Sequence, residues 1–119
     1  MLKRFALHDE NLGGRRVGTL TYDTARKAFA MDVDPGVPIA DLPLSLEILV
    51  HRGDYAIGHD WAMRWVRARI CPPGRHNIRE ILAELGLDAY DEFGILAATE
   101  ARCDKDGLYI AALAGENSD

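Results

Sequence analysis

Three prolines at positions 35, 38 and 43 divide this chain into two parts with different hydrophobic patterns. A proline has no backbone N–H to donate and fixes its own φ angle, so a strand that is paired on both sides does not continue through it. Any sheet that forms before Pro35 must therefore stop there. The segment 34–43 is predicted to be a loop.

The residues before this loop have the pattern of β-strands. Strands are predicted over 3–9, 16–23 and 27–34. In the last of these, Phe29, Met31 and Val33 recur at every second position, which is the period that turns one face of a strand toward a core. Gly13 and Gly14 lie between the first two strands and favour a hairpin turn. We expect a three-stranded antiparallel meander.

After residue 59 the apolar residues recur at helical spacing. Helices are predicted over 59–71, 75–86 and 91–102. The first must end before Pro72. Asn77 and Glu80 have the spacing of a capping box at the start of the second helix, and Gly86 is placed to end it in a left-handed conformation. Asp91 is the expected N-cap of the third helix.

The segment 44–50, LSLEILV, is too short for its periodicity to distinguish a strand from a helical turn. The β-branched Val50 and the flanking proline and glycine favour an extended segment. In that conformation Leu44, Leu46 and Ile48 share one face, which either fills the core beneath the sheet or shapes a surface for a partner.

A final strand over 108–115 is expected to return to the sheet, with 115–119 as a frayed tail. The predicted architecture is one α+β domain over residues 1–119. It has an antiparallel sheet, made of the N-terminal meander and the C-terminal strand, with about three helices on one face.

Charge is unevenly distributed in this chain of 119 residues with a net charge of −5. Residues 61–79 contain five arginines and no acid, whereas residues 80–119 contain ten acids against Arg102 and Lys105. Such a basic stripe is either solvated and paired within the fold or a docking face for an acidic partner or phosphates. The overall acidity argues against direct binding to nucleic acid.

Neither a membrane span nor a signal peptide is apparent in the sequence, because every apolar run is far shorter than about 18 residues. We expect a cytoplasmic protein. Cys71 and Cys103 are expected to be reduced and buried as small apolar side chains, since they lack the spacing of a zinc site. No metal or cofactor is predicted.

The motifs of catalysis are missing from the sequence. There is no phosphate-binding glycine loop and no nucleophile elbow. His8, His51, His59 and His76 fall in different predicted elements, and residues 51–54, HRGD, are predicted to be a turn. Glu80, Glu84 and Asp88 share the solvent side of a helix. The chain is predicted not to be an enzyme.

Recognition of another protein is the function that the residue types favour. Trp61 and Trp65 lie one helical turn apart, beside Arg64 and Arg67, and Trp and Arg dominate interface hot spots. Two tryptophans at this spacing also suit a core. We expect one of them to be buried and the other partly exposed.

Four stretches together resemble the N-terminal subdomain of HipA-type serine/threonine kinases. They are VGTL at 17–20, LPLSLEILVHRG at 42–53, WVRARICPPGRHNI at 65–78 and ILAELGL at 81–87. The resemblance spans about residues 15–115. It departs from the family where Ser45-Leu46 runs into Glu47-Ile48-Leu49. The kinase core is absent from these residues, so no catalytic residue is carried over.

The resemblance implies a free-standing version of that subdomain. In tripartite relatives of HipA-type toxin–antitoxin systems, a similar short protein is separate from the kinase and neutralises it. We therefore expect a non-enzymatic module that binds a HipA-like kinase core. The expected partner-binding residues are Leu44, Leu46, Trp61, Arg64, Trp65 and Arg67. The alternatives are a protein that self-associates, as a homodimer, and an enzyme or small-ligand protein with a polar pocket.

Overall fold

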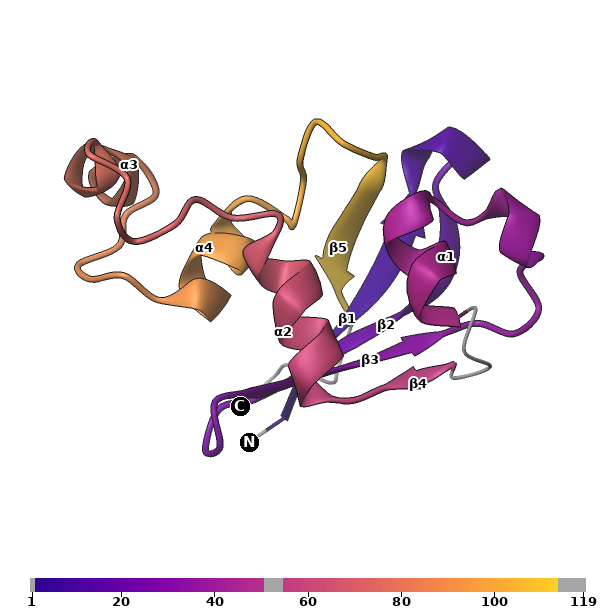
Figure 1. The fold of residues 1–119 in the computed structure, drawn as a ribbon. Helices are drawn as coiled ribbons and strands as arrows, with labels where there is room; N and C mark the ends of the chain where they lie inside the picture. The colour runs from indigo at the N-terminus through magenta and orange to yellow at the C-terminus, as the bar shows by residue number, and fades with distance from the viewer. Residues whose placement is uncertain (1, 51–54, 114–119) are drawn as a thin grey trace.

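The structure of the chain is a computed structural model that describes residues 2–50 and 55–113 (Figure 1). The strands are β1 (Leu2–Asp9), β2 (Arg15–Asp23), β3 (Ala28–Val33), β4 (Ala56–Ile57) and β5 (Leu108–Ala112). The helices are α1 (Leu44–Val50), α2 (His59–Arg67), α3 (Ile78–Glu84) and α4 (Glu92–Ala98). Two 3₁₀ turns, η1 (Glu10–Leu12) and η2 (Ile39–Asp41), lie in the connections.

The strands form one antiparallel sheet in the order β4-β3-β2-β1-β5. This confirms the predicted α+β class, with the N-terminal meander at its centre and the C-terminal strand beside β1. Along β3, Phe29, Met31 and Val33 are buried while Ala30 and Asp32 are exposed, so one face of the sheet is covered. Helices α1, α2 and α4 lie over that face, whereas α3 lies beyond the end of the sheet (Figure 1).

Gly18 has a structural role in the VGTL strand. It pairs with Val33 of β3 and with Leu7 of β1, next to an irregularity in the β1–β2 register. A Cβ atom at this position would lie 2.2 Å from the carbonyl oxygen of Asp32. The glycine therefore permits the close approach of β2 and β3.

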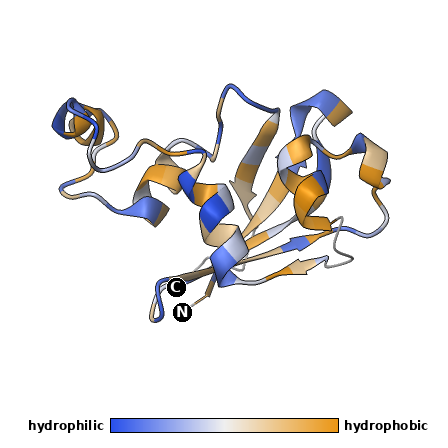
Figure 2. Ribbon diagram, viewed as in Figure 1, coloured by the Kyte–Doolittle hydropathy of each residue, from blue (hydrophilic) through white to orange (hydrophobic). Residues whose placement is uncertain are grey.

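The segment 44–50 is a helix, so the prediction of an extended conformation was wrong. The carbonyl of Pro43 accepts hydrogen bonds from the N–H groups of Leu46 and Glu47, both at 2.9 Å. A proline with a fixed φ angle is well suited to the start of a helix. Leu46 and Val50 are buried, whereas Leu44 is 69% exposed and Ile48 is 53% exposed. Figure 2 shows that α1 is hydrophobic along most of its length.

The other helices lie where they were predicted but are shorter. Gly86 has a φ of 75°, and the Leu87 N–H donates to the Leu82 carbonyl, which confirms the left-handed end of α3. Asp91 accepts from the Gly94 N–H and confirms the N-cap of α4. The predicted capping box is wrong, because the Asn77 side chain makes no cap hydrogen bond at the start of α3.

The outer edge of β3 is closed by backbone and side-chain groups that the sequence did not reveal. Strand β4 pairs with it at Met31 and Asp32, and the Val33 N–H donates to the Tyr55 carbonyl. Farther along, the Phe29 N–H donates to Nδ1 of His59 at 3.0 Å. His59, at the start of α2, thus binds a strand group that would otherwise be open to edge pairing.

Some predictions fall on residues outside the described ranges. They are the HRGD turn with His51 and the frayed tail with the end of the last strand, which the structure follows as far as Ala112. In the ranges that are described, every helix is too short or too polar to cross a lipid bilayer.

A matched pair of leucine variants tests the helical phase of α1. Leu46→Ala removes a fully buried side chain and should lower the free energy of unfolding by about 2–5 kcal/mol. Leu44→Ala should change it by less than about 0.5 kcal/mol, because that side chain is exposed. Urea denaturation measures both values. Equal losses would indicate that the two leucines share a face, as in a strand.

Candidate functional site

A buried ion pair lies where the chain leaves α2. Arg69 and Asp106 are 37 residues apart in sequence, and their side chains are 3% and 7% exposed. The guanidinium donates two hydrogen bonds to the carboxylate, from Nη1 to Oδ2 at 2.8 Å and from Nη2 to Oδ1 at 2.5 Å. This parallel arrangement is the strongest geometry that an arginine and a carboxylate form.

Neighbouring groups satisfy the remaining atoms of the pair. Nε of Arg69 donates to the Ala101 carbonyl at 2.6 Å, and its guanidinium lies 4.4 Å from the centre of the Trp65 ring. Asp106 also accepts from the Ser45 hydroxyl and from the Leu108 N–H, both at 3.0 Å. The pair thereby joins α1, the end of α2 and the segment before β5.

The backbone of the segment after α4 is shaped to reach this pair. Glu100 and Ala101 have φ angles of 56° and 60°, a conformation that residues other than glycine rarely adopt. The Ala101 N–H donates to the Leu96 carbonyl, and the Glu100 carbonyl accepts from Ile110 of β5. This turn points the Ala101 carbonyl at Arg69, so the strained backbone and the ion pair depend on each other.

Burial acts on the pKa of Asp106 in the opposite direction to its hydrogen bonds. Removal from water raises the pKa of the carboxyl, but the bonds from Arg69, Leu108 and Ser45 outweigh this effect, and the pKa lies below its ordinary value. A folded-state pKa below the unfolded one stabilises the fold above the ordinary value of about 4. That contribution is lost as the pH falls through the folded-state pKa.

A groove opens above this pair, between α1 and α2, with a volume of about 230 Å³. Its walls are Ser45 and Leu49 of α1 and the helical stripe Trp61, Arg64, Trp65 and Ala68. Arg69 and Asp106 form its floor, and Cys103 and Lys105 of the segment before β5 border it. We call this feature the α1–α2 groove.

Helix α1 also carries an exposed apolar stripe. Leu44 and Ile48 are four residues apart and so lie one above the other on the helix surface. Each directly precedes a groove residue, Ser45 or Leu49. The third strongly exposed large apolar side chain in the described residues, Leu2, is on β1. We call Leu44 and Ile48 the α1 stripe.

The structure separates the residues that were predicted to bind a partner. Trp65 is 5% exposed and Trp61 is half-buried, which confirms that one tryptophan is buried and the other partly exposed. The Arg64 guanidinium lies 4.6 Å from the centre of the Trp61 ring, at the surface. Arg67 lies outside the groove lining, and its Nε donates to Glu92 of α4 at 2.7 Å.

The two leucines of the predicted set lie on different sides of α1. Leu44 is exposed, whereas Leu46 is in the hydrophobic core. Leu46 and Trp65 are therefore buried beneath the surface of the two helices, whereas Leu44 and Arg64 are exposed and Trp61 is half-buried.

Arg69 and Asp106 were not among the site residues predicted from the sequence. A signal for Arg69 was present, because it lies four residues after Trp65 and one before Ile70, on the buried side of α2 and its continuation. An arginine on a buried face needs a carboxylate partner. Asp106 gave no such signal, since the DKDG segment predicts only a turn.

The remaining candidate ligands are dispersed. His8 stacks on Tyr109, and His59 binds β3. Cys71 and Cys103 are free thiols and are half-buried, and Cys71 packs against the hydrophobic core. Within the described ranges, no three side chains of His, Cys, Asp or Glu gather in a way that could hold a metal ion.

Comparison with known proteins adds no relative to this picture. A scan against protein-family models, a search of curated proteins and a search of solved structures each found no match to the chain. A function must therefore be inferred from the groove, the α1 stripe and the sequence motifs.

Asp106→Asn tests the ion pair. The variant leaves the charge of Arg69 buried without its counter-charge and should lower the free energy of unfolding at pH 7 by about 3–5 kcal/mol. Denaturation of the wild type should become easier as the pH falls below about 4, and this part of the pH dependence should be smaller in the variant. Asp104→Asn is the matched control, because Asp104 is exposed. A similar loss in both variants would contradict the assigned role of Asp106.

Proposed function

We propose that this protein is a non-enzymatic, cytoplasmic binding module that regulates a HipA-like serine/threonine kinase, as an antitoxin-type neutraliser that covers the kinase core. The kinase assignment rests on the resemblance of the sequence motifs. The proposal that a protein is bound rests on the surface of α1 and α2.

The α1 stripe carries the proposal of protein binding. Leu44 and Ile48 are 69% and 53% exposed, and they lie on the same helix as Ser45 and Leu49, which line the groove. Exposed apolar side chains that adjoin a pocket and a polar rim are typical of protein interaction sites. The core contacts of α1 are made by its buried residues, Leu46 and Val50. The exposed side chains of Leu44 and Ile48 add little to the packing of the core.

The contact set follows from exposure. It consists of Leu44, Ile48, Trp61 and Arg64, which replaces the set expected from the sequence. The half-buried Trp61 is held by its own helix and so loses little freedom on binding. Arg64 provides a charge beside it.

The polar groups on the groove floor favour binding over catalysis. Asp106 accepts hydrogen bonds from Arg69, from the Ser45 hydroxyl and from the Leu108 N–H. A general base needs a free lone pair aimed at a substrate. In Asp106 those lone pairs accept hydrogen bonds from within the fold.

Self-association through the same surface is the alternative. A two-fold interface brings the same patch of both copies together. Centred on the groove, it would place Arg64 and Lys105 of one copy near those of the other. Like charges at an interface oppose binding, so a partner of different composition is favoured.

Ile48→Glu tests the proposed interface. The charge enters the α1 stripe and should weaken binding to a purified HipA-like kinase from the same cell by about 2 kcal/mol or more, or roughly 30-fold. Isothermal titration calorimetry measures the affinity. Leu2→Glu is the matched control, because Leu2 is 50% exposed and lies on β1.

Three outcomes would contradict the proposal. One is an unchanged affinity of the Ile48→Glu variant, and another is an equal loss in the Leu2→Glu control. The third is a wild-type protein that binds no HipA-like kinase and is dimeric by light scattering, with Ile48→Glu converting it to a monomer, since this would assign the α1 stripe to self-association.

A further inference from the structure

We propose that the α1–α2 groove receives one apolar side chain from an acidic segment of the partner protein, whose flanking carboxylates bind Arg64 and Lys105. This inference rests on the proposed function of protein binding and names the chemistry of the partner surface.

The walls and the size of the groove favour a single apolar side chain. Leu49, Trp61, Trp65 and Ala68 are apolar or aromatic and face the hollow from two helices. The volume of about 230 Å³ is below the range of about 300–1,000 Å³ that is usual for pockets of small-molecule ligands. A hollow of this size suits a single side chain, as in the central pocket of a protein interface.

The positive charges at the rim of the groove favour an acidic partner. Arg64 and Lys105 are exposed and border the groove, and neither makes an ion pair in the described part of the chain. The charge of Arg69 on the floor is already balanced by Asp106. The groove therefore presents two positive charges above a neutral floor, although the whole chain carries a net charge of −5. A partner with carboxylates complements that local charge.

A second hollow in the molecule lacks this combination. It has a volume of about 370 Å³ and is lined by Arg67, Tyr90, Glu92 and two prolines. Its arginine is paired with Glu92, and its tyrosine hydroxyl donates to the Cys71 carbonyl. Both of these polar side chains are thus bound within the fold, and the hollow offers no unbalanced charge.

Trp65 lines the groove and is 5% exposed. Its Nε1–H is buried and has no hydrogen-bond partner among the described residues, so this donor is enclosed by the fold and is not a contact for the partner. The indole resonance of Trp65 is instead a reporter of a side chain that enters the groove beside it.

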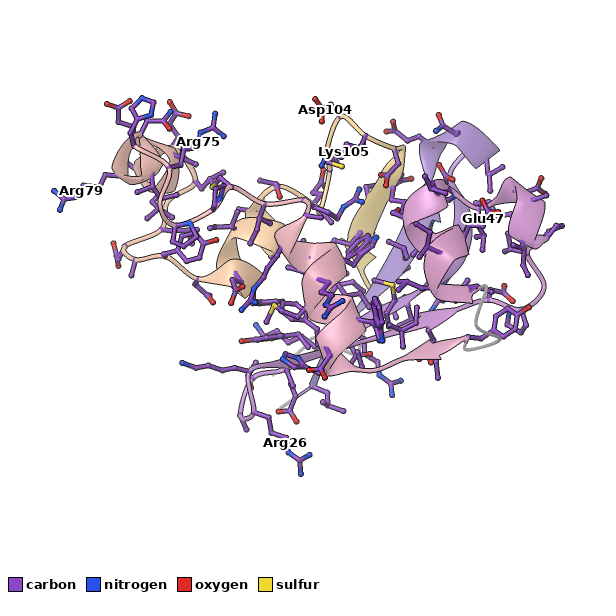
Figure 3. The ribbon with its side chains drawn as sticks, in the orientation of Figure 1. Arg26, Glu47, Arg75, Arg79, Asp104 and Lys105 are labelled. Atoms are coloured by element: carbon purple, nitrogen blue, oxygen red, sulfur yellow. The ribbon has the colours of Figure 1, made fainter. Side chains whose placement is uncertain are left out.

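A phosphate-rich partner fits the groove less well. Nucleic acid is bound by several cations along a backbone. The cations that line this hollow are Arg64, Lys105 and Arg69, and Arg69 is already paired with Asp106. Among the other exposed arginines of residues 61–79, Arg67 is paired with Glu92. Arg75 and Arg79 lie at α3, far from Lys105 (Figure 3). They do not extend the charged rim of the groove.

Peptide titration of the ¹⁵N-labelled protein tests the inference. The probe is a blocked pentapeptide with a central phenylalanine between two glutamates on each side. The indole N–H resonance of Trp65, assigned with the Trp61→Phe variant, should shift at about 5 mM peptide, which exceeds a dissociation constant of about 1 mM. Replacement of the glutamates by glutamine should weaken binding about three- to tenfold at low salt.

Two further probes separate the apolar and the charged contributions. The acidic peptide with glycine in place of phenylalanine should produce no shift of the Trp65 resonance at the same concentration. The double variant Arg64→Gln/Lys105→Gln should bind the glutamate and glutamine peptides equally. The matched control Arg75→Gln/Arg79→Gln should keep the wild-type preference, because it removes two exposed charges away from the groove.

The inference is overturned by an absent shift with the acidic phenylalanine peptide, by equal affinity for the glutamine peptide, or by a preference that the Arg64→Gln/Lys105→Gln variant retains. A short DNA duplex that shifts the Trp65 resonance at lower concentration than the peptide would also overturn it. The peptide titration contains no kinase. A negative titration would therefore overturn the inference about the groove without contradicting the proposed binding of a kinase, which calorimetry tests.

Discussion

The ion pair between Arg69 and Asp106 is the interaction on which the candidate site depends. Two charges removed from water are costly unless every lone pair and proton is bonded. Here Trp65, the Ala101 carbonyl, the Ser45 hydroxyl and the Leu108 N–H complete the bonding. The groups come from α1, from α2 and from the segment between α4 and β5, so the pair fixes three distant parts of the chain against one another.

The α1–α2 groove follows from this arrangement. Its floor is polar yet internally neutral, its walls are apolar, and its unbalanced charges are at the rim. In the proposed complex, a bound segment would be selected by its shape at the walls and by its charge at Arg64 and Lys105, because the polar floor is bonded within the fold. The α1 stripe adds two exposed apolar side chains on the neighbouring helix face. Lys105, which borders the groove, lies on the segment before β5 (Figure 3). These features are the basis of the proposal that the protein binds another protein.

The sequence predicted the sheet and most helices because long segments with one clear period leave few alternatives. It failed at 44–50, where apolar residues at 44, 46, 48, 49 and 50 satisfy both a strand and a helix, and packing decided. Trp61 and Arg64 were found from residue type. The pairing of Arg69 with Asp106 could not be predicted, because contacts across 37 residues depend on the fold. The left-handed turn at Glu100 and Ala101 could not be predicted either, because it contains no glycine.

The most direct test of this account is a double-mutant cycle on the ion pair. The free energy of unfolding would be measured for the wild type, Arg69→Met, Asp106→Leu and the double variant. If the pair fixes the three segments, each single change leaves an unbalanced or unbonded group, and the coupling energy should be about 2–3 kcal/mol. Single losses that add to the double loss within about 0.5 kcal/mol would show that the two side chains act independently, which contradicts the account.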